Sequence, residues 1–377
     1  MINAMKTIIL NNGMKVNFYQ KAEFKTFYAQ ITVNFGAKNL SFLNEKKETI
    51  VFPAGIAHFF EHKIFEKKEG DIFATFSHFG ANSNAWTNYD QTNYYFNSIQ
   101  DNNIEKNLSL LLDLVYIPYF TKEANAKEQG IIGQEISMYD DIPEAQLEYG
   151  LLKNAFPMQP LSWDIAGDKK SISEISPEML YEIHKYFYQP SNLTMSIVGD
   201  LNINALSKQL NNLIEKYPVN KIEYHPINLF DSDKPIIEYG FKKMNVSRPL
   251  TGVMFKISTN FQNKKEAIKF SIASRIILEL LFGESSDWYQ KQYEAKLIDP
   301  DFGISTEISK EYGYILFFSK INKNDQQFKQ LILERLKQTK NTISILEIKL
   351  KLKSMLGDEI RHLDDISNIT RTNLEGY

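Results

Sequence analysis

The pattern of apolar and polar positions predicts alternating strands and helices along the first half of the chain. Two short alternating runs flank Asn12-Gly13, a dipeptide typical of a two-residue hairpin turn. Farther along, Ile104, Leu108 and Leu111 recur at helical spacing. The predicted elements are strands 7–10, 15–19 and 26–35, helices 54–66 and 70–79, strands 84–88 and 92–99, and helices 104–115 and 123–140.

The same order of elements recurs after residues 217–235, where three prolines and two aspartates interrupt any periodicity. The repeat distance is about 220 residues. We therefore expect two related domains, 1–216 and 236–377, joined by the linker 217–235. The predicted elements of the second domain are strand 250–258, helix 264–281, strands 302–308 and 312–320, and helices 325–338 and 343–362.

Composition narrows the class of protein. A chain of 377 residues with 43% hydrophobic and 24% charged residues is typical of a globular protein with more than one core. The net charge of −3 gives no electrostatic argument for binding nucleic acid or an anionic membrane. No apolar run is long enough for a signal peptide or a membrane helix, so we expect a cytoplasmic protein. The absence of cysteine excludes disulfides and thiolate metal ligands.

One segment carries most of the chemical information. His58 and His62 are i,i+4 neighbours on one face of the predicted helix 54–66, and Glu61 lies beside them. Two neutral imidazoles can bind one Zn²⁺, and the carboxylate is then left to act on water. This H-x-x-E-H order is the inverzincin pattern. The alternative, a structural core histidine, is disfavoured because the chain has only six histidines and two of them share this turn.

A third metal ligand must come from elsewhere, because catalytic zinc usually has three protein ligands. Helix 123–140 carries Glu128 and Glu135 two turns apart on one stripe, with Ile131 and Ile132 between them. Acids on a helix are normally solvated, but apolar neighbours on the same stripe favour a buried, paired or metal-bound role.

These features resemble the pitrilysin, insulysin and mitochondrial processing peptidase superfamily, in which H-x-x-E-H is followed after a long gap by a ligand glutamate. Here Glu135 follows His62 by 73 residues, and Glu128 matches the additional glutamate of the family. Residues 80–96 are similar to the Asn-Ala strand of the family, and residues 188–200 to the end of its first domain. GIAHFFEHKIFE and KEQGIIGQEISMYDD most resemble short bacterial insulinase-like peptidases that work beside an inactive paralogue.

The resemblance implies an α+β fold of two related domains, each an antiparallel sheet with helices packed on one face. It implies one Zn²⁺ per chain, held by His58, His62 and Glu135, with Glu61 as the general base of a metalloendopeptidase. Glu128 is either an orienting residue near the metal or part of a structural ion pair. It also implies a longer second domain, so the chain is either naturally abbreviated at its C-terminus or truncated.

The implied substrate is a peptide or an unfolded segment, added as a strand to the edge formed by Asn84, Ala85, Trp86 and Thr87. The Trp86 side chain could equally belong to the core. We expect a heterodimer with an inactive paralogue, because residues 285–321 contain no arginine to complete the site as in relatives. The alternative function is a non-catalytic peptide-binding or scaffold subunit, a class in which H-x-x-E-H is characteristically incomplete.

Overall fold

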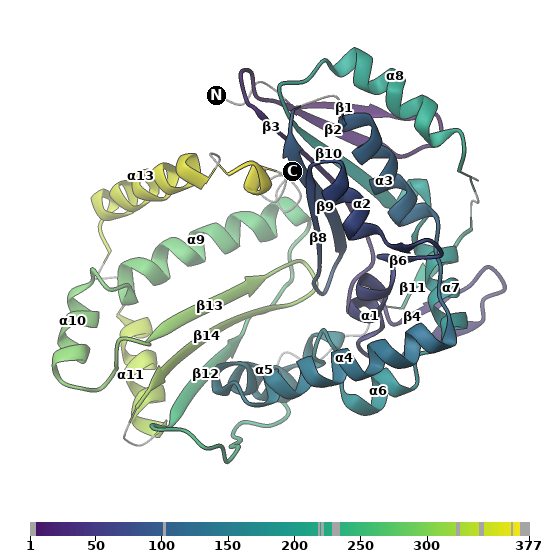
Figure 1. Cartoon of the computed structure of the whole chain (residues 1–377). Helices are drawn as coiled ribbons and strands as arrows, with labels where there is room; N and C mark the ends of the chain where they lie inside the picture. Colours follow the sequence, from purple (N-terminus) through teal and green to yellow (C-terminus); the bar gives the residue numbers. More distant parts are fainter. Residues whose placement is uncertain are drawn as a thin grey trace. The chain divides into compact units, whose positions relative to one another are not determined.

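The computed structural model describes residues 5–100, 103–217, 219, 222–227, 234–321, 325–338, 343–362 and 365–369. The chain forms two compact units, which are considered separately (Figure 1). Of the described residues, those within 5–138, 159–227 and 365–369 belong to unit 1, and those within 139–158 and 234–362 belong to unit 2. Helices and sheets occur in both, so the α+β prediction is confirmed.

Unit 1 is built on a six-stranded sheet with the strand order β1-β2-β10-β3-β9-β8. All neighbouring strands are antiparallel except β2 and β10, which are parallel. The strands are β1 Lys6–Ile9, β2 Lys15–Gln20, β3 Thr26–Val33, β8 Ala81–Thr87, β9 Thr92–Ile99 and β10 Leu193–Gly199. Short strands make two small sheets, one of β4 Ser41–Leu43, β5 Thr49–Val51 and β11 His225–Pro226, the other of β6 Glu66–Lys67 and β7 Gly70–Asp71.

Helices of unit 1 bury the apolar side chains of this sheet, because one face of each amphipathic element carries its large hydrophobic residues. From β3, Phe27, Ala29, Ile31 and Val33 enter the core at 1% exposure or less. The helices are α1 Ile56–Lys63, α2 Ile72–His78, α3 Ile104–Tyr116, α4 Lys122–Asp140, α6 Lys169–Ser173, α7 Pro177–Phe187 and α8 Ile203–Ile214, with 3-10 turns η1 Pro160–Ser162 and η2 Pro190–Asn192.

Unit 2 holds a three-stranded antiparallel sheet with the order β12-β14-β13 and a core that includes Leu281, Phe282, Phe317 and Ile332. Its strands are β12 Leu250–Lys256, β13 Gly303–Ile308 and β14 Gly313–Lys320. Its helices are α5 Pro143–Ala155, α9 Lys264–Phe282, α10 Asp287–Glu294, α11 Asp325–Lys337 and α13 Ile345–His362.

Compared with the predicted domains 1–216 and 236–377, the compact units assign residues 365–369 to unit 1 and residues 139–158 to unit 2. Helix α5 lies in this segment and packs against β12 of unit 2, where Lys256 Nζ donates a hydrogen bond of 2.8 Å to the carbonyl of Ala155. The predicted linker 217–235 lies partly outside the described residues, and within it β11 pairs with β4 of unit 1.

Candidate metal centre

Helix α1 carries the H-x-x-E-H motif and begins abruptly at Gly55. The φ angle of Gly55 is +87°, a conformation that side-chain-bearing residues rarely adopt. A Cβ atom there would lie 2.4 Å from the carbonyl oxygen of Ala166, so the chain can pass this point only without a side chain. The apolar stripe of α1, which includes Phe59 and Phe60 at 0% exposure, fixes the rotation of the helix against the core.

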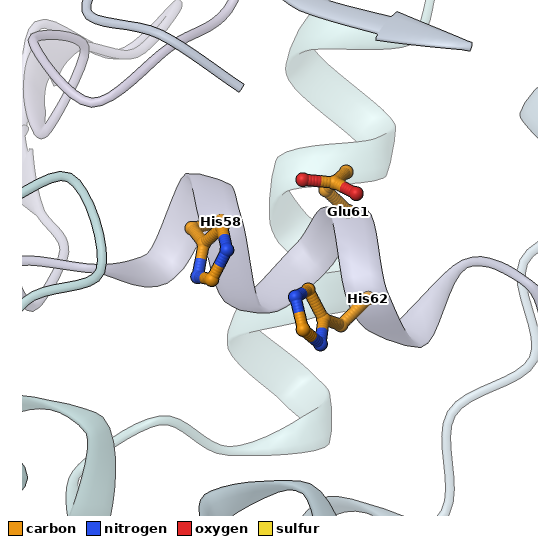
Figure 2. Close-up of side chains that lie close together, drawn as sticks. All are labelled: His58, Glu61 and His62. Carbon is orange, nitrogen blue, oxygen red and sulfur yellow. The ribbon is translucent and has the colours of Figure 1, made fainter. Parts of the chain in front are cut away.

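The motif residues converge on one place. Ligand-type atoms of His58, Glu61 and His62 all lie within 4.8 Å of one another (Figure 2). The two imidazole rings are 4.5 Å apart between centroids. Among the described residues, this is the one group of three or more histidines, aspartates and glutamates with ligand atoms this close.

Glu135 reaches the same place from α4. Its Oε1 lies 3.8 Å from His58 Nε2, and its Oε2 lies 3.8 Å from His62 Nε2. Both distances are too long for a hydrogen bond. Ligand bonds of about 2.0–2.2 Å in a tetrahedral zinc site would separate ligand atoms by roughly 3.3–3.6 Å. The distance from each Nε2 atom to the Glu135 carboxylate is only slightly longer than this, so Glu135 lies close enough to share a metal with the two rings.

Glu128 contacts the Nδ1 side of the His62 ring, whereas Glu135 lies near the Nε2 atom of the same ring. Its Oε1 is 3.0 Å from His62 Nδ1, and its Oε2 is 3.8 Å from the Nζ of Lys63. Lys63 is only 2% exposed and also pairs with Glu66. An ionised Glu128 accepts a hydrogen bond from the Nδ1–H group of His62. The proton then stays on Nδ1, and the lone pair on Nε2 is available to a metal.

Burial controls the protonation of His58. Burial and the neighbouring His62 lower the pKa of His58 to about 4, so its imidazole is neutral near pH 7. His58 Nδ1 is buried without a hydrogen-bond partner in the described part of the chain. Such an atom is costly to bury. A neutral, unpartnered imidazole is the state in which histidine binds a divalent metal, so His58 fits that role.

The pKa values of the other two motif residues, His62 and Glu61, are each shifted in opposite directions by burial and by neighbouring groups. Burial lowers the pKa of His62, but the hydrogen bond to Glu128 and the nearby carboxylates raise it overall. For Glu61, burial raises the pKa, and the opposing effects of His62 and a hydrogen bond from Thr87 do not cancel that rise. A carboxylate with a raised pKa is a better proton acceptor than a solvated one.

The four residues predicted for substrate binding all lie in β8, which is the last strand of the six-stranded sheet. Asn84 Oδ1 accepts a hydrogen bond of 2.8 Å from the backbone N–H of Ala85. The Thr87 hydroxyl donates to Glu61 Oε2 over 3.1 Å. Of the residues predicted to act near the metal, His58, Glu61, His62, Glu128 and Glu135 are therefore brought together in unit 1.

Two features of the site differ from what the sequence patterns predict. Lys63 was not predicted to be part of the site. Its position was a usable signal, because it lies on the same buried face of α1 as Ile56, Phe59 and Phe60. A lysine on such a stripe signals a buried ion pair. Ile131 was expected to share a sheltered stripe with Ile132, but Ile131 is 44% exposed and only Ile132 is buried. The two residues lie about 100° apart on opposite sides of the stripe, so only one of them faces the core.

Comparisons with known proteins agree on one family. Residues 44–169 match "Insulinase (Peptidase family M16)", and residues 174–353 match "Peptidase M16 inactive domain". The uncharacterized zinc protease YmfH of Bacillus subtilis is 37% identical over 94% of this chain and 83% of its own length. The zinc protease PqqE of Helicobacter pylori is 25% identical over 97% of this chain and 81% of its own length.

Solved structures show the same fold. A putative M16-like peptidase from Alicyclobacillus acidocaldarius superposes with a TM-score of 0.90 and 28% identity, covering 99% of this chain and 88% of the other. A protease from Helicobacter pylori superposes with a TM-score of 0.82 and 20% identity, covering 98% of this chain and 88% of the other.

Within the described ranges, every helix is too short or too polar to cross a membrane.

Proposed function

The chain belongs to peptidase family M16, and from this premise we propose that it is a zinc metalloendopeptidase that cleaves peptides or unfolded segments. One observation supports the proposal most directly. The Nε2 atoms of His58 and His62 each lie 3.8 Å from a different oxygen of Glu135, with the Glu61 carboxylate beside them. Relatives that share most of this chain's length are named zinc proteases.

In this proposal, His58, His62 and Glu135 hold one Zn²⁺. The bound ion supplies a Lewis acid that polarises a peptide carbonyl and lowers the pKa of water toward about 7. Glu61 takes a proton from the attacking water and returns it to the leaving amine. Glu128 orients His62 through the Nδ1 hydrogen bond, which is the role that a partner of a metal-binding histidine usually has.

The proposed substrate binds as an extended strand beside β8. This strand ends the described sheet and pairs with a strand on one side only, so a peptide would add to its other side. Asn84 shields the Ala85 N–H with its side-chain oxygen, and a substrate backbone would replace that contact. Pairing of this kind uses backbone atoms, so it suits unfolded segments of varied sequence.

We further propose that the active enzyme is a heterodimer with an inactive paralogue. The sequence of residues 285–321 contains no arginine, whereas an oxyanion formed during peptide hydrolysis needs preorganised donors. A site shared between two related chains would take these donors from the paralogue.

The direct test is Glu61→Gln in the zinc-loaded protein. We expect bound zinc to stay at one per chain and the fold to be kept, because no proposed ligand changes. Peptide turnover should fall by about 100-fold or more, since general-base catalysis contributes roughly 10²–10⁴ in rate. Metal analysis and mass spectrometry of a peptide mixture measure the two outcomes.

Glu69→Gln is a suitable control, because Glu69 is exposed and follows the same helix. It should cleave peptides at the wild-type rate. Near wild-type turnover by purified Glu61→Gln would refute the mechanism. Wild-type protein that binds zinc but hydrolyses no peptide, alone or with its paralogue, would favour a non-catalytic peptide-binding role.

A further inference from the structure

Thr87, at the end of β8, has its hydroxyl committed to the motif helix rather than to the open edge of the sheet. Thr87 Oγ1 donates a hydrogen bond of 3.1 Å to Oε2 of Glu61. The strand and the helix are packed together, so this contact joins two rigid elements. The expected substrate pairing along β8 uses backbone atoms, so it leaves the Thr87 hydroxyl free to bond Glu61.

A second threonine fixes the position of the first. Thr92 lies directly opposite Thr87 in the β8–β9 ladder and is 0% exposed. Its Oγ1 donates a hydrogen bond of 2.9 Å to the carbonyl oxygen of Phe35 and lies 3.4 Å from Thr87 Oγ1. Because a hydroxyl has one proton, Thr92 can only accept from Thr87 while it donates to Phe35.

The single proton of Thr87 therefore has two acceptors within reach, Glu61 and Thr92. Glu61 is nearer, and its carboxylate is the stronger acceptor when ionised. The terminal torsion of a glutamate is otherwise broad, so a free carboxylate would sample many orientations. The hydrogen bond from Thr87 restricts this torsion by holding Oε2, and it leaves Oε1 without a hydrogen bond from Thr87.

We propose that Thr87 is a positioning residue that holds Oε2 of Glu61 and leaves Oε1 as the oxygen that accepts and returns the proton. This inference rests on the proposed peptidase function. When water gives up its proton to Oε1, Oε2 still accepts the Thr87 hydrogen bond, so the carboxyl group keeps its orientation. The same oxygen then returns the proton to the leaving amine, with no rotation in between.

The test compares Thr87→Val, which keeps the shape but loses the hydroxyl, with Thr87→Ser, which keeps the hydroxyl. We expect Thr87→Val to lower kcat by roughly 10- to 100-fold, the loss typical of misplaced catalytic groups. KM and zinc affinity, measured by chelator competition, should change by no more than about twofold, because neither ligands nor the backbone edge change. Thr87→Ser should restore most of kcat.

Thr7→Val is the matched control. Thr7 lies in β1, the opposite end strand of the same sheet, and its hydroxyl donates to Asn17 Oδ1 over 2.9 Å. This variant loses a comparable hydrogen bond and should keep the wild-type kcat. A raised KM with unchanged kcat in Thr87→Val would show a substrate contact instead. Failure of Thr87→Ser to recover kcat would also overturn the proposal.

Crystal structures of wild type and Thr87→Val provide a readout that does not need turnover. The Glu61 carboxylate should occupy one orientation in wild type and several in Thr87→Val. An unchanged carboxylate in Thr87→Val would contradict the inference even if no peptide were cleaved. Inactive wild-type protein, by contrast, would refute the proposed function and leave this structural comparison decisive for Thr87.

Discussion

A row of alternating charges lies behind the candidate metal centre, from Glu66 through Lys63 and Glu128 to His62. Burial raises the pKa of Glu128, but His62 and Lys63 outweigh it, so the pKa lies below the usual value. Glu128 is thus an ionised acceptor for His62 Nδ1. Lys63 is buried, so its charge has to be balanced by the carboxylates of Glu66 and Glu128. Moving either carboxylate would leave a buried charge without its partner, which is costly.

Glu128 and Glu135 can be separated by parallel substitution. Glu135→Gln should reduce bound zinc to well below one per chain, because a proposed ligand becomes a neutral amide that binds zinc weakly. Glu128→Gln should keep zinc but lower affinity or activity by about 10- to 100-fold, as is common for groups that orient a ligand. Metal analysis after dialysis and peptide hydrolysis measure both. The reverse order of zinc loss would exclude Glu135 as the ligand.

For single residues, the sequence predicts which side chains could bind a metal better than it predicts which other side chains contact them. The i,i+4 spacing of His58 and His62 requires only a helix, so it could be read directly. The approach of Glu135 to both rings depends on where α1 and α4 lie relative to each other. The stripe on α4 offered both Glu128 and Glu135, and only the family resemblance chose Glu135 as the ligand. The Thr87–Glu61 hydrogen bond depends on where β8 ends beside α1, which no local pattern encodes.

Among the elements, the entry to α1 depends on a close backbone crossing. Gly55→Ala should destabilise the protein by more than the about 1–2 kcal/mol that a left-handed conformation costs alanine, because the new Cβ would meet Ala166 at 2.4 Å. Gly13→Ala is the control, since Gly13 has a φ of +93° and open space around it. Urea unfolding measures both. Equal losses would show that the crossing is not tight.

The C-terminal end of α3 is held by two basic side chains. Lys67 Nζ donates to the carbonyls of Leu114 and Ile117, and His184 Nε2 donates to Val115 over 2.8 Å. These donors satisfy carbonyls that the helix itself leaves unpaired. Burial lowers the pKa of His184 to about 4, and nearby Lys67 contributes, although the backbone hydrogen bond opposes the shift.

This lowered pKa makes stability sensitive to acid. The unfolded chain binds a proton at His184 near pH 6.5, whereas the folded chain does so only near pH 4, so stability is lost as pH falls through this window. Between pH 7 and pH 5, wild type should lose about 2 kcal/mol more unfolding free energy than His184→Gln, which keeps a donor but does not titrate. Urea unfolding of both proteins at the two pH values checks this. Parallel losses would contradict it.

Elements with strong local patterns were predicted well, and elements defined by distant partners were not. The observed α9 Lys264–Phe282 and β9 Thr92–Ile99 agree closely with predicted ranges 264–281 and 92–99. The position of β10 between β2 and β3 could not be predicted, because its partners lie more than 150 residues earlier in the chain. Membership of α5 in unit 2 likewise depends on a long-range contact with β12.

At the scale of the whole molecule, the two units repeat one topology. The order β12-β14-β13 in unit 2 corresponds to β3-β9-β8 in unit 1, with α11 following β14 as α3 follows β9. The predicted repeat of about 220 residues is visible in these matching starts. Helix α9 has no histidine, so the second copy cannot hold a metal by the same scheme.

Two arginines of unit 2 already have partners within that unit. Arg248 pairs with Asp299 at 3.0 Å, and Arg335 donates to the carbonyl of Leu281. Within 285–321, Tyr289, Tyr312 and Tyr314 are at most 7% exposed, whereas Tyr293 is 45% exposed. Buried side chains cannot reach a substrate without repacking. The proposed heterodimer would instead take donors for the oxyanion from the paralogue.

We expect peptide hydrolysis to depend on the concentration of an inactive paralogue, because only the assembled pair has the metal site and the missing donors. The zinc-loaded chain should cleave peptides slowly when purified alone and at least about 10-fold faster with the paralogue, with zinc content unchanged. Activity and mass should be measured together over a partner titration, so that the rise in rate follows heterodimer formation. An Arg→Ala series in the paralogue should abolish the gain without preventing assembly. Full activity from a verified monomer, unaffected by the paralogue, would refute this arrangement and require unit 2 to supply the donors itself.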